Sequence, residues 1–352
     1  MRPNNAACNC PTMVRTLASI LALLAVCTVV AVAAENPATE AVRRLARGIN
    51  LGNALEAPAE GAWGVTLRSE YFDIIKDAGF TSVRIPVRWS AHAQAEAPYA
   101  IAPEFFARVD FVVRGALSRG LNVVIDDHHY AELFQNPQRE LPRLIALWDQ
   151  IASHYRDYSQ DVFFELLNEP QGEMTDDVWQ EVMLKLLRTV RRTNPDRMVI
   201  VGPGHLNGLD HLANLRLPDE DTRLIATFHY YRPMSFTHQM ASWVKGSELW
   251  KGTVWAGTAD QRQAVKSDFD EAAQWARANR RPLYVGEFGA YGAADIESRV
   301  RWTAAVVQEA ERHGFGWAYW EFNAGFGAYD TEAQAWREDL LNALIARPPV
   351  KK

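Results

Sequence analysis

Two glutamates stand at the ends of apolar runs, where their neighbours shape the backbone. Glu169 lies in Asn-Glu-Pro at 168–170, at the end of the run 162–167, and Glu287 lies in Gly-Glu-Phe-Gly at 286–289. Proline stops a strand because it cannot donate to the sheet, and glycine lets the backbone approach a ligand closely. Two such carboxylates can cleave a glycosidic bond, one as acid and base and the other as nucleophile. A single glutamate would more simply be a solvated loop residue, so the pair is what indicates chemistry.

Other polar residues follow apolar runs in the same manner. They are Asn53, Glu56, Arg84, Asp126, Asp127, His128, His129, His229, Tyr231, Trp320 and Glu321. One or two polar groups at such positions would merely meet water. Carboxylates, imidazoles, an arginine and an indole together indicate a functional site, because such sites gather groups that perturb one another's ionisation.

The elements that position these residues are short apolar runs separated by longer amphipathic stretches. The eight runs cover 48–52, 82–87, 122–126, 162–167, 198–201, 224–228, 283–285 and 316–320. Between them apolar residues recur at three- and four-residue steps, as in 178–192, which is typical of helices. Strands that alternate with helices pair in parallel. Eight such units predict an α/β fold, a (β/α)8 TIM barrel with its site at the carboxyl ends of the strands. We expect a single catalytic domain over 35–352.

The segment 1–34 has the features of a secretory signal peptide. Arg2 and Arg15 precede an apolar run at 17–32 that ends in small residues, the order found in export signals. The run is marginal for a membrane span, which needs about 20 apolar residues. A lipoprotein anchor at Cys27 is disfavoured because a bulky valine precedes that cysteine. All 3 cysteines lie in this segment, so the exported chain is expected to hold neither a disulfide nor a thiolate metal site.

Length and charge narrow the class of protein further. The chain has 352 residues, 48% of them apolar, and a formal net charge of -6. That length suits one barrel domain, and no linker or internal repeat suggests a second module. The mild acidity and the lack of a lysine and arginine cluster argue against a nucleic-acid partner.

The chain resembles glycoside hydrolase family 5, in the clan of retaining β-glycosidases whose catalytic glutamates end the fourth and seventh strands. The matching segments are Arg-Gly-Ile-Asn-Leu-Gly-Asn-Ala-Leu-Glu at 47–56, Val-Arg-Ile-Pro-Val-Arg-Trp at 83–89, Asp-His-His-Tyr at 127–130, Leu-Asn-Glu-Pro at 167–170, Phe-His-Tyr-Tyr at 228–231, Phe-Thr-His-Gln at 236–239, Gly-Glu-Phe-Gly at 286–289 and Tyr-Trp-Glu-Phe at 319–322. Each motif alone is weak, but their order is specific. The resemblance covers the chain after the signal peptide and is closest to bacterial endoglucanases that cut β-1,4-glucan and, in some members, β-1,4-mannan.

The resemblance implies a role for each residue around the scissile bond. Glu169 would be the acid/base and Glu287 the nucleophile. Asn168 would hold the sugar 2-hydroxyl, a contact that strengthens in the transition state. Arg84 would lie against Glu287 and favour its ionised form, because a nearby cation lowers the pKa of a carboxyl. Tyr231 would donate a hydrogen bond to Glu287.

Further residues are implied to bind the sugar chain. His128 and His229 would line the cleaved bond, and Trp320 would be the platform for the sugar on the non-reducing side of the cut. The remaining positions that match sugar-binding residues of this branch are Asn53, Glu56, His129, His238, Trp243 and Glu321. Trp63 lies in a glycine-rich loop, where a subsite wall and simple packing are both open.

The sequence is compatible with three functions. A metal-dependent barrel hydrolase could use Asp126, Asp127, His128, His129 and His229 as ligands, but neighbours on one strand point to opposite faces. A sugar-binding barrel without catalysis would not need both glutamates. The favoured reading is a secreted retaining endo-β-1,4-glucanase, with endo-β-1,4-mannanase as its alternative. It needs no metal or other cofactor. We expect a β-linked polysaccharide or oligosaccharide as its partner, no membrane span in the mature chain, and a monomer.

Overall fold

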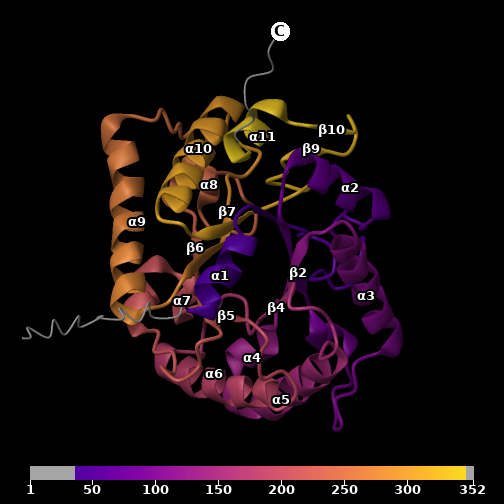
Figure 1. The fold of residues 1–352 in the computed structure, drawn as a ribbon. Coiled ribbons are helices and arrows are strands. Elements are labelled where there is room, and N and C mark those ends of the chain that lie inside the picture. The colour runs from indigo at the N-terminus through magenta and orange to yellow at the C-terminus, as the bar shows by residue number, and fades with distance from the viewer. Residues whose placement is uncertain (1–35, 346–352) are drawn as a thin grey trace, which may run out of the picture. The chain divides into compact units, whose positions relative to one another are not determined.

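Eight parallel strands close into a barrel in chain order (Figure 1). The computed structural model describes residues 36–345, so the predicted signal peptide lies outside the described residues. The strands are β1 (Gly48–Asn50), β2 (Ser82–Val87), β3 (Asn122–Asp127), β4 (Val162–Glu165), β5 (Val199–Val201), β6 (Leu224–Tyr230), β7 (Leu283–Phe288) and β8 (Gly316–Tyr319). β8 pairs with β1 and completes the ring. The predicted (β/α)8 barrel is confirmed.

Helices surround the barrel, and the connections between them carry shorter elements. The helices are α1 (Pro37–Arg44), α2 (Ser69–Ala78), α3 (Pro103–Ser118), α4 (Ala131–Gln135), α5 (Pro137–His154), α6 (Asp176–Arg191), α7 (Gly204–Asn207), α8 (Met234–Thr237), α9 (Ala259–Asn279), α10 (Ile296–Arg312) and α11 (Glu338–Leu344). Several begin at a residue whose side chain accepts a backbone N–H, such as Thr175 before α6 and Thr258 before α9. Such caps satisfy donors that the first turn leaves unpaired. A two-stranded ribbon of β9 (Tyr329–Asp330) and β10 (Ala335–Trp336) precedes α11.

Two apolar clusters hold the barrel together. One fills its interior and includes Val124, Phe163 and Ile200 from the strands with Ala38 and Val42 from α1. Figure 1 shows α1 at the centre of the ring of strands, where it covers one end of the barrel. The second cluster lies between the strands and the outer helices. Because side chains alternate along a strand, the residues two positions beyond Val124 and Phe163 also face the interior.

Several strands end later or earlier than the sequence predicts. β6 continues through His229 to Tyr230 and β7 continues through Glu287, whereas β4 ends at Glu165, before the asparagine and glutamate that follow. The pairing of β6 with β7 shifts register between Phe228 and His229. Such irregularities redirect side chains at the rim of a barrel. A side chain next to the shift can therefore point in a direction that regular alternation would not give it.

Within 36–345, no helix is both long and apolar enough to span a bilayer.

Candidate active site

Arg84 in β2 is the centre of a buried charge network. Its Nη1 donates to Glu287 Oε1 at 2.8 Å, and its Nε and Nη2 donate to the two oxygens of Glu165 at 2.7 and 2.9 Å. Nη2 also lies 3.0 Å from Asp126 Oδ2 and donates to Asn168 Oδ1 at 2.8 Å. The side chain is fully buried. A buried charge is tolerated only when it is paired, so one cation and three carboxylates depend on one another here.

Glu169 and Glu287 meet beside His229. The Nδ1 atom of His229 lies 2.9 Å from Glu169 Oε1 and 3.6 Å from Glu287 Oε2. A carboxylate oxygen from each glutamate and a ring nitrogen of His229 all lie within 4.8 Å of one another. Tyr231 donates its hydroxyl to Glu287 Oε2 at 2.9 Å. Both carboxylates can therefore reach one bond of a ligand in this space.

The environment affects the two glutamates differently. Burial raises the pKa of Glu169 to about 7, although the Arg84 charge opposes the rise. Burial also raises the pKa of Glu287 against the opposing effects of His229, Arg84 and the Tyr231 hydroxyl. Arg84 thus acts on Glu287 in the expected direction, but burial is the larger effect. Because Arg84 and Tyr231 donate hydrogen bonds to Glu287, its ionised form is the better stabilised of the two.

The glycines beside Glu287 lie where neighbouring strands leave no room for a side chain. We expected them to bring Glu287 close to a ligand. A Cβ atom on Gly286 would lie 2.9 Å from Thr227 Oγ1 and 3.1 Å from His229 Nε2, and one on Gly289 would lie 2.1 Å from the carbonyl oxygen of Trp320. They make room for the neighbouring strands, and so hold His229 and Trp320 at the site.

Trp320 lies over a wall built from the first and third strands. Its ring stacks on His128 with the centroids 5.9 Å apart and the planes 7° apart. His128 Nδ1 lies 2.5 Å from Asp126 Oδ2, and burial holds the pKa of His128 well below its usual value. A Cβ on Gly52 would lie 2.9 Å from the indole, so this glycine lets the indole lie against the backbone. Trp320 is partly exposed, as a platform for a flat ligand must be.

Asn53, Glu56 and Glu321 form a connected group below this wall. Asn53 donates its Nδ2 to Glu321 Oε2 at 2.8 Å, while Glu56 accepts the backbone N–H groups of Asn53 and Ala54. Glu56 and Glu321 are buried, and burial raises their pKa values to about 8 and about 7. In this arrangement the two acids hold Asn53 in its left-handed conformation, φ 62°. Their direct contact with a sugar stays a prediction.

Two chains of aromatic contacts lead away from the site, one from Tyr231 and one from His128. On one side the ring of Tyr231 contacts His238, which contacts Trp243, an indole that is 60% exposed. On the other side His128 contacts His129, which contacts the 44% exposed Trp63. Two exposed indoles thus stand at the ends of two aromatic chains, the first reaching Glu287 through Tyr231 and the second reaching Trp320 through His128.

The residues of the metal-hydrolase reading do not gather into one site. Among the residues that the structure describes, two groups of three have ligand atoms within 4.8 Å of one another: Glu169 with His229 and Glu287, and Asp176 with His205 and His211. Neither contains Asp126, Asp127, His128 or His129. The first group is the glutamate pair itself, with Arg84 bonded to one of its members, and a cation there would compete with that arginine.

The family model for cellulase, glycosyl hydrolase family 5, matches residues 46–325. The chain belongs to glycosyl hydrolase family 5. The resemblance noted from the motifs is confirmed, and the matched span includes every residue of the site.

Curated relatives and solved structures of this family agree with the assignment. Endoglucanase H of Acetivibrio thermocellus is 38% identical over 313 residues, which cover 87% of this chain and 33% of the relative. The Cellulase/esterase CelE of the same organism is 30% identical, with 87% and 38% covered. The chain thus spans 33% and 38% of the length of these two relatives. A structure of Thermotoga maritima Cel5A in complex with cellobiose has a TM-score of 0.86 and 49% identity, covering 88% of this chain and 100% of that one. Another, in complex with mannotriose, has the same TM-score and identity.

Sequence reasoning missed Glu165, and it named Asp126 only as a strand-end residue and a possible metal ligand, not as a partner of Arg84. Glu165 lies inside the run that opens at Val162, and Asp126 pairs with it across β3 and β4. Both face the barrel interior beside Arg84. An acidic residue at an interior-facing position of a strand, on the same face as an arginine two strands away, was the signal that could have found them.

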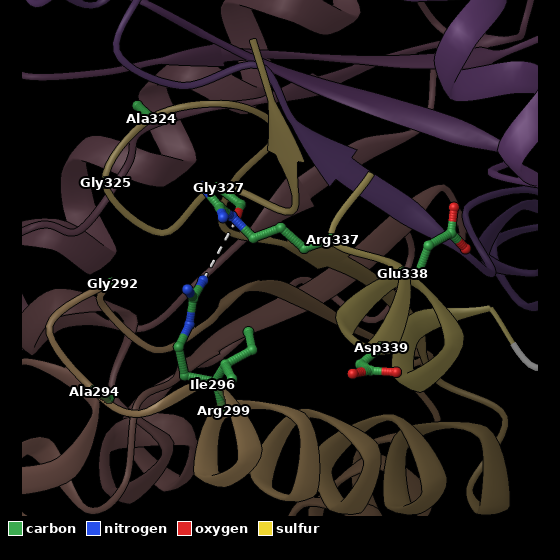
Figure 2. Close-up of a pocket in the computed structure, with 10 residues that line it drawn as sticks. All are labelled: Gly292, Ala294, Ile296, Arg299, Ala324, Gly325, Gly327, Arg337, Glu338 and Asp339. Carbon is green, nitrogen blue, oxygen red and sulfur yellow. Dashed lines mark hydrogen bonds between the residues drawn. The ribbon is translucent and has the colours of Figure 1, made fainter. Parts of the chain in front are cut away.

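A hollow lies outside the candidate active site, between the loop after β7 and the segment that leads to α11 (Figure 2). It is lined by Gly292, Ala294, Ile296, Arg299, Ala324, Gly325, Gly327, Arg337, Glu338 and Asp339. Figure 2 shows the Arg299 guanidinium turned toward Gly327, whose carbonyl oxygen accepts its bond at 3.4 Å. Arg299 also donates to the carbonyl oxygen of Phe326 at 2.7 Å. The hollow is therefore lined by an arginine that bonds to the loop carrying Phe326, whose ring contacts Trp243. None of the predicted site residues lines the hollow.

Proposed function

We propose that the protein is a secreted retaining endo-β-1,4-glucanase with Glu169 as acid/base and Glu287 as nucleophile. The observation that carries the proposal is the proximity of the two carboxylates, whose nearest oxygens lie within 4.8 Å of each other. Retaining glycosidases hold their carboxyl groups about 5 Å apart, whereas inverting ones leave roughly 6.5–9.5 Å for a water molecule. The geometry supports direct attack by one carboxylate.

The first step forms a covalent bond to the enzyme. Ionised Glu287 attacks the anomeric carbon while Glu169 gives its proton to the leaving glycosidic oxygen. A pKa of about 7 keeps a proton on Glu169 in mildly acidic solution. Arg84 and Tyr231 hold the two oxygens of Glu287 at 2.8 and 2.9 Å, which orients the attacking carboxylate.

The second step returns the enzyme to its starting state. Glu169, now ionised, takes a proton from water, and the oxygen of that water displaces Glu287 from the anomeric carbon. His229 Nδ1 lies 2.9 Å from Glu169 and can stabilise its ionised form. Asn168 directs its Oδ1 to Arg84, which leaves its amide nitrogen to donate to the sugar 2-hydroxyl.

An internal cut requires sugar sites on both sides of the glutamate pair. Trp320 would support the sugar on the non-reducing side, and Trp243 and Trp63 are exposed indoles beyond the centre. His129 and His238 belong to the two aromatic chains. Asn53 bonds to Glu321, the residue after Trp320. This arrangement favours a long β-1,4-linked chain over a terminal sugar. The cellobiose and mannotriose complexes of the Thermotoga maritima protein make mannan a second candidate substrate.

The signal-peptide features of 1–34 support export from the cell. Mass spectrometry of protein recovered from the medium or periplasm should give a chain that begins at Glu35. A chain that stays in the cytoplasm at full length would contradict export.

Product analysis tests the activity. The protein should lower the viscosity of carboxymethylcellulose or mixed-linkage glucan early in the release of reducing ends, with glucomannan or mannan degraded more slowly. A chelator should not affect the rate. Loss of activity with the chelator would favour the metal-hydrolase reading, and a protein that binds oligosaccharide without releasing reducing sugar would be a binding barrel.

A further inference from the structure

Three potential metal ligands meet outside the catalytic centre. Asp176 is the first residue of α6, while His205 and His211 lie in the connection after β5. His211 Nδ1 lies 3.1 Å from Asp176 Oδ2, and His205 Nε2 lies 4.0 Å from the same oxygen. The two imidazole rings stack with their centroids 3.9 Å apart. All three ligand atoms lie within 4.8 Å of one another.

These separations suit a small divalent cation. Zn²⁺ binds nitrogen and oxygen ligands at about 2.0–2.2 Å in a tetrahedron, so two ligands of one ion are separated by roughly 3.3 Å. The measured 3.1 and 4.0 Å lie on either side of that value. The lone pair of an imidazole nitrogen lies in the plane of its ring, so ligation of one ion by both histidines requires His205 to turn out of the stack. Its side chain is 58% exposed and can turn without repacking the core.

The Asp176 carboxylate is already held in place by a hydrogen bond, and one of its oxygens has no partner among the described residues. Asn214 donates its Nδ2 to Asp176 Oδ2 at 2.7 Å, which orients the group in the manner of an outer-shell partner. Within the described part of the chain, the other oxygen, Oδ1, is buried without a hydrogen-bond partner. It faces Gly204, where a Cβ atom would lie only 2.3 Å away. A cation beside the carboxylate would compensate for that unpaired acceptor.

The backbone that presents His205 is strained. His205, Leu206 and Asn207 are consecutive residues with left-handed φ angles of 50, 63 and 52°. Left-handed φ angles are unfavourable for residues that carry a Cβ, and strain of this kind persists where surrounding contacts or a ligand fix it. The Leu206 N–H donates to the carbonyl oxygen of Pro170 at 3.1 Å. The turn is therefore fixed against the segment that follows Glu169.

We propose that Asp176, His205 and His211 form a binding site for a structural Zn²⁺ or a similar late divalent transition metal, with water as the fourth ligand. Two imidazoles with one carboxylate favour such metals over Mg²⁺ and Ca²⁺, which prefer oxygen ligands. The ion joins the connection after β5 to the start of α6, next to the segment that carries the acid/base. It takes no part in bond cleavage.

Cobalt binding tests the site directly, because tetrahedral Co²⁺ with nitrogen ligands absorbs visible light. Untagged protein, stripped with chelator, is titrated with Co²⁺ and then with Zn²⁺, with binding heat measured in parallel. We expect one equivalent of tetrahedral Co²⁺, displaced by Zn²⁺, and a higher melting temperature with Zn²⁺ present, because a ligand that binds only the folded state stabilises it. The absence of the cobalt spectrum and of binding heat would overturn the proposal.

Variants locate the ion. His211→Ala and, as the more exposed and structurally safer change, His205→Ala should each weaken Zn²⁺ binding at least tenfold and abolish the shift in melting temperature. Glu287→Gln is the matched control for the other cluster and should bind Zn²⁺ as the natural chain does. If Glu287→Gln loses the ion and both histidine variants keep it, the metal binds the glutamate pair and the proposed site is wrong. This test is independent of sugar cleavage, so failure of the proposed activity would not affect it.

Discussion

At the scale of single residues, the site depends on how one arginine is shared among carboxylates. Arg84 bonds to Glu165, Asp126 and Glu287, so its charge is divided, and the fully buried guanidinium has a pKa held well above its ordinary value. Glu169 instead lies against His229 Nδ1 at 2.9 Å, and burial raises its pKa to about 7. Environments that separate the protonation of two carboxyls assign acid and base roles.

The alkaline side of the pH profile should report Glu169. In the proposed mechanism the first step needs a proton on this group, so kcat/KM should fall as pH rises through about 7, where the carboxyl ionises. Glu169→Gln should remove that fall for an aryl glycoside whose leaving group needs no proton. Initial rates of the natural chain and of the variant across pH check this. A profile that still falls near pH 7 in Glu169→Gln would assign the ionisation to another group.

The hydroxyl of Tyr231 should matter while its neighbour's does not. Tyr231→Phe removes the donor to Glu287 at 2.9 Å, and a hydrogen bond to a charged group contributes about 1.5–3 kcal/mol, so kcat/KM should fall roughly 10- to 100-fold. Tyr230→Phe is the matched control, because Tyr230 bonds to Asp268 outside the barrel interior. Its kcat/KM should stay within about twofold. Equal losses in both variants would point to a general effect on folding.

At the scale of elements, the site depends on how closely neighbouring strands approach. Gly286 in β7 leaves room for the side chains of Thr227 and His229 from β6, next to the register shift in that pair. The sequence allowed the eight strands, their order and the meeting of the two glutamates to be predicted, because hydrophobic periodicity and strand-end motifs are local signals. It did not reveal the irregular pairing of β6 with β7, or that Glu165 shares Arg84 with Glu287, because these depend on contacts between residues far apart in the chain.

Gly286→Ala tests the packing between β6 and β7. The new methyl would lie 3.1 Å from His229 Nε2, and displacing a catalytic group by about 1 Å can cost roughly 100-fold in rate. We expect kcat to fall by about that factor. Circular dichroism and the melting temperature should show that the barrel remains folded.

Gly120→Ala separates this effect from backbone strain. Gly120 has a φ of 69° and its nearest contact would be 3.6 Å away, so alanine there should lower stability by about 1 kcal/mol and leave kcat unchanged. A normal kcat in Gly286→Ala would show that the site tolerates movement of these strands.

At the scale of the whole molecule, the barrel holds a central reaction site between exposed aromatic surfaces. Family 5 membership and the closed barrel establish the scaffold. The resemblance singled out Trp243, whereas Trp63 could not be separated from a packing tryptophan by sequence, because only the fold shows which indoles reach solvent. The position of the Asp176, His205 and His211 cluster likewise arises from the meeting of two connections. Sequence periodicity contains no signal for it.

Trp243→Ala should distinguish long substrates from short ones. The indole is 60% exposed, and removing an aromatic surface of this kind should raise KM for a soluble glucan roughly tenfold. An aryl cellobioside that does not reach Trp243 should be cleaved at the normal rate. Leu249→Ala, at an 84% exposed apolar residue, is the control and should alter neither value. An equal effect on both substrates would place Trp243 within the central site.

The assignment of roles to the two glutamates is tested most directly by pre-steady-state kinetics of Glu169→Ala with dinitrophenyl cellobioside. This leaving group departs without a proton, so the first step should stay fast, while the second should be slow because water has lost its general base. The account predicts a burst of dinitrophenolate followed by a slow steady rate that azide accelerates, with no burst and no azide rescue in Glu287→Ala. A burst and azide rescue in Glu287→Ala, and neither in Glu169→Ala, would contradict the assignment and reverse the roles.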